Sequence, residues 1–387
     1  MSVVIDLGMH PFADTFISED QLCLSEPVYP LQCTLDTDSG ELKLKYETRD
    51  DERYNLYSYS YTSSNSKFSR QHWDEYATEI SEYLPKGCKV LEVGSNDGFL
   101  TKKLIMKGYQ AKGVDPSSAM VSLASDRGVS TYNMLFNFEN SKQIKRDFGT
   151  VSAIVANNVF NHANNPDDFV KSVGNLLDEG GLFIYELPYW LCTIRDKKFD
   201  QIYHEHVTYF TVKYSYNLLQ KHGFQLKKVD VVDYHGGSLR IVAKKQEGSE
   251  LNEEIKDMIL REEEYGLFDR KMYKEFMLSI TKERNSFMSK IYEIKKNGFP
   301  IIGVGAAAKA NTFLNFYNMD NSILDYITDV SEHKKGKYTP LTRIPIVGDE
   351  IFAQYGKVYA LILSWNISDL LLEKIRQINK NVEFLLL

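Results

Sequence analysis

The chain has 387 residues, of which 43% are hydrophobic and 26% charged, and its formal net charge at pH 7 is −7. This length exceeds one ordinary hydrophobic core and predicts two or three domains in a soluble, globular protein. The negative charge argues against a surface that binds nucleic acid by neutralising phosphates. No apolar run is long enough to span a bilayer, and the N-terminus lacks the basic and apolar regions of a signal peptide. Four scattered cysteines without a CxxC spacing favour reduced thiols and a cytoplasmic protein.

The first 66 residues predict a small β module. Residues 28–47, "VYPLQCTLDTDSGELKLKYE", alternate between apolar and polar side chains around an Asp-Ser-Gly turn, which is typical of a β-hairpin. Residues 67–85 then carry apolar and aromatic side chains at helical spacing and stop at Pro85. We therefore expect a domain boundary near residue 66.

Residues 67–246 predict a doubly wound α/β domain. Buried strands alternate with helices of about ten to fifteen residues, a pattern that favours a parallel sheet. The expected strands are 88–95, 111–117, 129–135, 151–160 and 182–188, and the expected helices are 97–108, 118–128 and 167–181. A helix and two strands joined through a Gly-Gly turn follow, which predicts an antiparallel edge hairpin. This Rossmann-like layout is that of class I methyltransferases.

Residues 247–387 predict a third, C-terminal domain. Residues 248–297 are charged but repeat apolar side chains at helical spacing, so we expect two helices that pack on a domain. From residue 300 a strand, a glycine turn and a helix, "PIIGVGAAAKANTFLNF", open a second Rossmann-like α/β unit. Further strands are expected at "LDYITDV", "IPIVG" and "VYALILSW", and a last helix at "ISDLLLEKIRQINKN".

The stretch "VLEVGSNDGFL" places Gly94 and Gly98 between a buried strand and a helix. Glycines there let the backbone approach a ligand closely, and Asp115 at the end of the next strand can accept both ribose hydroxyls. The loop lacks the first glycine of the dinucleotide fingerprint, so it favours S-adenosylmethionine (SAM) over NAD; a purely structural turn is the alternative. The expected cofactor-binding residues are Glu92, Gly94, Asn96, Asp97, Gly98, Asp115, Leu135, Asn157 and Asn158, with Phe136 beside Leu135.

The segment "DQIYHEHVTYF", residues 200–210, holds two histidines, a glutamate and three aromatic side chains. In a strand, His204 and His206 would share one face. A metal site is disfavoured because no cysteine or third histidine lies at a ligand-like spacing. A structural histidine pair remains an alternative. A proton-transfer site is the third, because histidine exchanges protons near neutral pH.

Several motifs together resemble the nucleotide-diphosphate-sugar C-methyltransferases of deoxysugar pathways. The resemblance spans nearly the whole chain and implies transfer of a methyl group from SAM to a carbon of a nucleotide-linked 4-keto-6-deoxy sugar. Its most specific part is "YHEH" combined with the C-terminal unit, because many methyltransferases share the SAM loop alone. It is carried by "DLGMHPFADTFI", "LEVGSNDGFL", "GVDPS", "NNVFNHANNPDDFV", "YHEH", "GGSLRI", "GVGAAAKANTFLNF", "KGKYTPLTRIPI" and "SWNISD".

In such a reaction a base removes the proton next to the ketone, and the enolate carbon takes the methyl group. The resemblance implies His206 as this base, Tyr203 as a donor to the enolate oxygen, and His162 as a further active-site histidine. Glu205 would orient an imidazole or bind a sugar hydroxyl or amine. His204 is interpreted as structural.

The resemblance also implies an N-terminal active-site tyrosine in "YSYSYTSSNS". Tyr61 is our choice, with Tyr57 and Tyr59 as rivals in an uncertain register and a packing role as the alternative. In the C-terminal unit, Gly303, Gly305 and Lys309 could hold a diphosphate through helix amides and a lysine charge, unless this unit is a plain support domain. The expected substrate-binding residues are Gly237, Gly305, Lys309, Asn311, Lys337, Trp365 and Asn366.

The family's N-terminal module binds zinc through two CxxC pairs, and this chain departs from that pattern. It begins after the position of the first pair, and Asp36 and Ser39 of "DTDSG" align with the second, leaving Cys33 as a remnant. We therefore predict no metal. Rival functions are O- or N-methylation of the sugar, a non-catalytic SAM-binding subunit, and a sugar epimerase or ketoreductase, the last disfavoured by the glycine pattern. We expect no nucleic-acid or membrane partner, and a monomer or homodimer.

Overall fold

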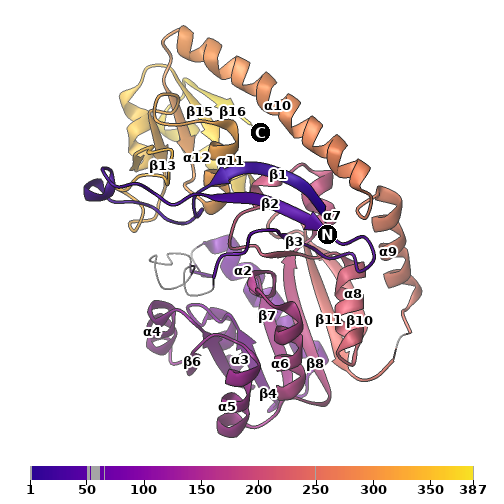
Figure 1. Ribbon diagram of the computed structural model, residues 1–387. Helices are drawn as coiled ribbons and strands as arrows, with labels where there is room; N and C mark the ends of the chain where they lie inside the picture. Colours follow the sequence, from indigo (N-terminus) through magenta and orange to yellow (C-terminus); the bar gives the residue numbers. More distant parts are fainter. Residues whose placement is uncertain (1, 50–52, 54–61, 65, 249, 387) are drawn as a thin grey trace.

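The computed structural model describes residues 2–49, 53, 62–64, 66–248 and 250–386. The strands of these described residues form three sheets, and Figure 1 shows the N-terminal and C-terminal sheets side by side above the central one. Tyr57, Tyr59 and Tyr61 lie outside the described residues, so the prediction of an N-terminal active-site tyrosine stays a prediction.

The central sheet has seven strands in the order β10-β11-β8-β7-β4-β5-β6. β4 to β8 run parallel, and β10 and β11 form the antiparallel edge hairpin that was predicted. Because β4 pairs with β5 on one side and β7 on the other, the chain reverses direction across the sheet at β4, where doubly wound sheets bind ligands. The strands are β4 (Lys89–Val93), β5 (Gln110–Asp115), β6 (Thr131–Asn133), β7 (Val151–Asn157), β8 (Leu177–Pro188), β10 (Phe224–Val232) and β11 (Ser238–Lys245).

Helices cover both faces of this sheet, so its strands are apolar on both sides. In β4, Leu91 packs into the core on one face and Val90 into the core on the other. The fold class predicted from the alternation of strands and helices is therefore confirmed. The helices are α2 (Lys67–Tyr83), α3 (Phe99–Met106), α4 (Ser118–Asp126), α5 (Phe138–Phe148), α6 (Pro166–Leu176), α7 (Trp190–Arg195) and α8 (Val212–Lys221).

Several elements were not anticipated from the sequence, including α7 and three others. Helix α5 begins at an Asn137 cap that accepts from Asn140 N at 2.8 Å, but it buries only Ser141 and Ile144, too few apolar side chains for a periodic signal. Strand β1 (Ser2–His10) is interrupted by two register shifts in its pairing with β2. Strand β16 (Val382–Leu385) is short and close to the end of the chain.

The N-terminal sheet has the order β1-β2-β3-β9. The predicted hairpin is present as β2 (Tyr29–Leu35) and β3 (Leu42–Leu44), which are antiparallel. Its last strand, β9 (Thr208–Tyr209), follows directly after the "YHEH" segment and pairs antiparallel with β3. This sheet therefore crosses the boundary predicted at residue 66 and attaches the N-terminal residues to the predicted catalytic segment.

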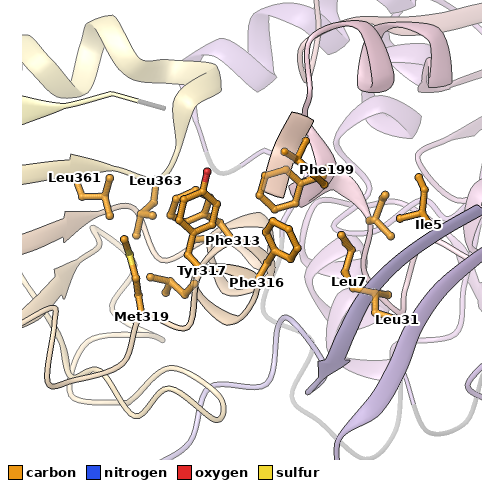
Figure 2. Close-up of a cluster of buried hydrophobic side chains, with 14 of the residues drawn as sticks. Ile5, Leu7, Leu31, Phe199, Phe313, Phe316, Tyr317, Met319, Leu361 and Leu363 are labelled. Carbon is orange, nitrogen blue, oxygen red and sulfur yellow. The ribbon is translucent and has the colours of Figure 1, made fainter. Parts of the chain in front are cut away.

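The C-terminal sheet is parallel, in the order β14-β13-β12-β15-β16. One hydrophobic core joins it to the N-terminal sheet: Ile5 and Leu7 of β1, Phe199 before the "YHEH" segment and Phe313 of α11 belong to the same cluster (Figure 2). The remaining elements are α9 (Glu253–Tyr265), α10 (Arg270–Lys296), β12 (Ile301–Val304), α11 (Ala308–Tyr317), β13 (Tyr326–Thr328), β14 (Ile346–Val347), β15 (Val358–Ile362) and α12 (Ser368–Ile378). In the described part of the chain no helix is long and apolar enough to cross a membrane.

Candidate active site

A cavity of about 160 Å³ lies at the carboxyl ends of β4, β5 and β7, the edge where doubly wound sheets bind ligands. Of the predicted cofactor-binding residues it includes Gly94, Asn96, Asp115, Leu135 and Asn158. The sequence did not single out its other polar lining residues Ser117, Asn137, Asn164, Asn165 and Asp168. The lining fits SAM, since it combines a carboxylate at the end of β5 with the apolar walls formed by Met134, Phe136 and Phe169.

The glycine loop after β4 has the conformation that its sequence predicts. Gly94 lies in the left-handed region with φ +68°, and an added Cβ would come within 2.7 Å of the Val159 side chain. Asn96, also left-handed, donates its amide to the Asp115 carboxylate at 2.8 Å. Asp115 accepts a second amide from Ser117 at 2.9 Å, and burial raises the pKa of this carboxyl. The loop and the acid are thus fixed together at the rim of the cavity.

Four predicted cofactor residues do not line the cavity. Glu92 is buried beneath it and accepts from the Thr101 hydroxyl, and burial raises the pKa of this carboxyl to about 8. Asp97 accepts from Ser63 at 2.6 Å and pairs with Arg127 at 2.9 Å. Gly98 caps the N-terminus of α3. The side-chain amide of Asn157, in β7, is buried and has no hydrogen-bond partner among the described residues.

Residues 203–206 form a turn, so the prediction that His204 and His206 share a strand face is wrong. The His206 amide donates to the Tyr203 carbonyl at 2.9 Å, which closes the turn, and β9 begins only at Thr208. Their side chains have different surroundings. The His204 ring packs 5.9 Å from Phe12 and 5.7 Å from Tyr29, measured between ring centres.

His206 is buried and held through both ring nitrogens. Its Nδ1 lies 2.8 Å from the Gln201 carbonyl oxygen, and its Nε2 lies 2.7 Å from the Tyr203 hydroxyl. A carbonyl oxygen only accepts, so Nδ1 carries the proton and Nε2 accepts from Tyr203. Burial lowers the pKa of His206 to about 3, with the positive charge of Lys309 acting in the same direction. The imidazole is therefore neutral at neutral pH.

His162 connects the cofactor cavity to His206. It lines the cavity, and its ring centre lies 5.2 Å from that of His206. Burial lowers the pKa of His162 well below its ordinary value, and the neighbouring His206 and Arg53 lower it further. Arg53 donates to the His162 carbonyl at 3.1 Å and to the Thr48 carbonyl at 2.7 Å, which holds this histidine against the N-terminal module.

His206 is also close to a polar cluster that the C-terminal domain completes. Lys309 of α11 is half-buried, and its ammonium is buried without a hydrogen-bond partner among the described residues. It lies 4.6 Å from the centre of the Trp365 ring, whose indole N–H donates to Asp200 at 2.6 Å. Burial lowers the pKa of Lys309 to about 8, and the Asp200 carboxylate opposes this shift.

The Gly-Gly turn between β10 and β11 packs against the same cluster. A Cβ at Gly236 would come within 2.6 Å of the Trp365 ring, and Lys198 donates to the Gly236 carbonyl at 2.8 Å. Gly237 has no side chain, but its backbone carbonyl accepts from the Tyr189 backbone amide at 3.0 Å. The structure thus brings three predicted substrate residues, Gly237, Lys309 and Trp365, to the neighbourhood of the turn at residues 203–206.

The other predicted substrate residues make different contacts. The Gly305 amide donates to the Thr328 carbonyl at 2.8 Å, and Asn311 donates to the Ala13 carbonyl at 2.5 Å. Asn366 is exposed on a short 3₁₀ helix. Lys337 lines a second cavity, between the N-terminal residues and the C-terminal domain.

Sequence reasoning missed His235 and Gln201. His235 has φ +51°, an uncommon conformation for a residue other than glycine, and such strain is concentrated at functional sites. Its carbonyl accepts from the Gln201 side chain at 3.2 Å, while the Gln201 carbonyl accepts from His206. Gln201 therefore contacts both the His206 ring and the His235 backbone, and its only sequence signal was its place three residues before "HEH". In the described part of the chain no three His, Cys, Asp or Glu side chains are placed to share a metal ion.

Comparison with known proteins defines the class first. Residues 66–229 match a family model described as a methyltransferase domain, and residues 233–386 match one described as a C-methyltransferase C-terminal domain. Together with the cofactor cavity at the carboxyl edge of a class I sheet, these matches identify the chain as a SAM-dependent methyltransferase whose C-terminal part is similar to that of C-methyltransferases.

A particular relative supports this. The C-methyltransferase NovU of Streptomyces niveus is 26% identical over 381 residues, which cover 98% of this chain and 90% of the relative. Among solved structures, magnesium protoporphyrin IX methyltransferase of Synechocystis PCC 6803 with bound SAM is 14% identical, with a TM-score of 0.37 over 51% of this chain and 90% of that chain. The CurJ carbon methyltransferase is 16% identical, with a TM-score of 0.35 over 46% of this chain and 54% of that chain.

Proposed function

We propose that the protein methylates a carbon next to the ketone of a nucleotide-linked 4-keto-6-deoxy sugar. The motif resemblance and the similarity to NovU support this proposal. The observation that carries it is spatial: His162 lines the cofactor cavity, and the centre of its ring is 5.2 Å from that of His206. The proton acceptor His206 and the methyl donor SAM would therefore act on opposite sides of His162.

His206 is the proposed base. Its Nδ1 proton is fixed on the Gln201 carbonyl, so the free lone pair is on Nε2. In the free protein this lone pair accepts the Tyr203 hydroxyl, and substrate binding would redirect that hydroxyl to the ketone oxygen and free Nε2 for the carbon-bound proton. A neutral buried imidazole is a weak base, but the enolate charge beside it raises its affinity for the proton.

Two further groups would act on the developing charge. The buried ammonium of Lys309, close enough to His206 to lower its pKa, would stabilise the enolate oxygen. Burial, with the Asp14 carboxylate nearby, raises the pKa of Glu205 to about 8, so below that pH Glu205 is neutral and can donate to a sugar hydroxyl. When bound, SAM supplies the electrophilic methyl group that the enolate carbon takes.

Solvent deuterium exchange without SAM tests this chemistry directly. Wild-type protein should exchange the hydrogen next to the ketone of a nucleotide-linked 4-keto sugar in D₂O, as followed by NMR, because proton removal precedes methyl transfer. The variant His206→Ala should lose this exchange. His222→Ala is the matched control, since that histidine lies at the end of α8 on an Asp167 carboxylate and should leave exchange unchanged.

Two results would contradict the proposal. Absence of exchange in the wild type with keto sugars would favour O- or N-methylation or a non-catalytic subunit. Exchange that persists in His206→Ala, in protein that still binds SAM, would remove His206 from the role of base.

A further inference from the structure

A second cavity of about 310 Å³ lies between the N-terminal residues 11–27 and the C-terminal domain, away from the cofactor cavity. It is within the size range of small-molecule sites. Its lining combines aromatic, hydroxyl, amide, acidic and basic side chains: Phe12, Asp14, Thr15, Phe16, Ser18, Gln21, Ser25, Glu26, His333 and Lys337, with Pro11, Ile17, Leu24 and Pro27.

The two walls of this cavity are fastened together. Ile17 and Tyr338 form a β-bridge with hydrogen bonds of 3.0 and 2.8 Å. Glu26 accepts from the Leu341 amide at 3.0 Å and pairs with Arg343 at 2.9 Å. Leu341 and Arg343 both have positive φ, 62° and 56°, although neither is glycine. A strained loop that is held in this way is a feature of preformed binding sites.

The chemistry of the lining fits a nucleoside diphosphate. Lys337 is partly buried and its ammonium makes no ion pair among the described residues, so it is available to a phosphate oxygen. Of the two lining carboxylates, Glu26 is already neutralised by Arg343. Phe16 offers an aromatic ring to a base or ribose, and the Lys334 ammonium lies 4.9 Å from its centre.

One wall of the cavity packs against the turn at residues 203–206. Asp14 lines it and is close enough to Glu205 to raise the pKa of that carboxyl. Phe12 also lines it, and its ring centre is 5.9 Å from that of His204. A ligand in the cavity would therefore be separated from residues 203–206, where the sugar is expected, by the side chains of Phe12 and Asp14.

The glycine turn predicted to hold the diphosphate is less suited to that role. The amide of Gly305 donates to Thr328, and the amide of Ala306 donates to the Asp329 carboxylate at 2.9 Å. A phosphate at this helix N-terminus would have to displace a carboxylate of the same charge.

We infer that the nucleoside diphosphate end of the substrate binds in this second cavity, with a phosphate on Lys337 and the base or ribose against Phe16. This inference rests on the proposed function, because it assumes a nucleotide-linked substrate. It places the substrate across the junction of all three parts of the chain, with the sugar at His206.

Isothermal titration calorimetry with dTDP, UDP and GDP tests the inference on the full chain. At least one of these nucleotides should bind the wild type. Lys337→Gln and Phe16→Ala should each weaken that binding roughly tenfold or more. Lys335→Gln is the matched control, a neighbouring lysine that pairs with Glu332 and does not line the cavity. SAM affinity, measured on every variant, should stay unchanged and confirms that each is folded; Lys337→Gln, in a surface loop, keeps the test open should Phe16→Ala misfold.

The outcomes separate the two proposals. If a nucleotide binds the wild type and binds Lys337→Gln and Phe16→Ala equally well, this cavity is not its site, while the proposed function stands. If none of the three nucleotides binds the wild type at millimolar concentration, the cavity inference falls together with the nucleotide-linked substrate, whereas the deuterium exchange of a keto sugar still reports on the carbon chemistry.

Discussion

The two Rossmann-like units of this chain begin with the same local design and put it to different uses. In each, a glycine turn follows a strand, and an aspartate at the end of the next strand accepts an amide of the turn: Asn96 donates to Asp115 and Ala306 to Asp329. In the first unit Asp115 also lines the cofactor cavity. In the second, Lys334 lies 4.0 Å from Asp329 and donates to the Ala306 carbonyl at 2.7 Å, so protein groups satisfy the turn. A glycine turn followed by such an aspartate therefore predicts a backbone conformation. It predicts a bound ligand only where the carboxylate also lines a cavity.

Alanine at the two glycine turns should give the largest contrast. Gly94→Ala places a methyl group 2.7 Å from Val159 at a positive φ, which should distort the loop and weaken SAM binding roughly 100-fold or more. Gly305→Ala meets the Ser364 hydroxyl and should cost about 1–3 kcal/mol of unfolding free energy without changing SAM affinity. Calorimetric SAM titration and urea denaturation of both variants measure the two effects. Equal loss of SAM binding in both would break the comparison.

Substitution of Asp115 and of Asp329 should give the same contrast in SAM affinity as the two glycine substitutions, but a smaller one. Asp115→Asn removes a carboxylate from the cavity and should weaken SAM binding roughly tenfold, since a hydrogen bond to a charged group contributes about 1.5–3 kcal/mol. Asp329→Asn should leave SAM affinity unchanged, because its carboxylate is occupied by Ala306 and Lys334. The same titration decides between them. An unchanged SAM affinity in Asp115→Asn would contradict the assignment of this acid.

The pH dependence of SAM binding should sharpen the contrast further. Burial raises the pKa of Asp115, so as pH falls its carboxylate is protonated earlier than an ordinary aspartate and SAM affinity should decline by a few fold below neutral pH. The variant Asp115→Asn carries no proton to gain and should show a flatter profile. Parallel profiles for the two proteins would place the responsible group elsewhere.

The central fold followed from the sequence because its signals are local. Apolar strands, helices at 3.6-residue spacing and the Gly-Gly hairpin predicted the sheet, and Gly94 and Asp115 predicted its ligand edge. Helix α5 was not predicted because the segment that Asn137 caps is mostly polar and shows no apolar periodicity. The shared face of His204 and His206, which assumed a strand at residues 203–206, was wrong because alternation over four residues cannot be distinguished from a turn whose side chains also diverge.

The second half of the candidate site depends on contacts between distant segments. Lys309 is brought near His206 by the core that joins Phe199 to Phe313. No single stretch of the sequence predicts the contact between these two distant segments. The Arg53 contact with His162 and the cavity between residues 11–27 and Lys337 arise in the same way. Residue types could nominate the histidines, but only the packing of the three parts shows which of them meet.

The most direct test of the account is the site of methylation. Wild-type protein, a nucleotide-linked 4-keto-6-deoxy sugar and SAM labelled with ¹³C in its methyl group should give a product whose labelled methyl is bonded to the carbon beside the ketone, as read from carbon–carbon coupling by NMR, and His206→Ala should give none. A methyl group bonded to oxygen or nitrogen, or a carbon-methylated product from His206→Ala, would contradict it.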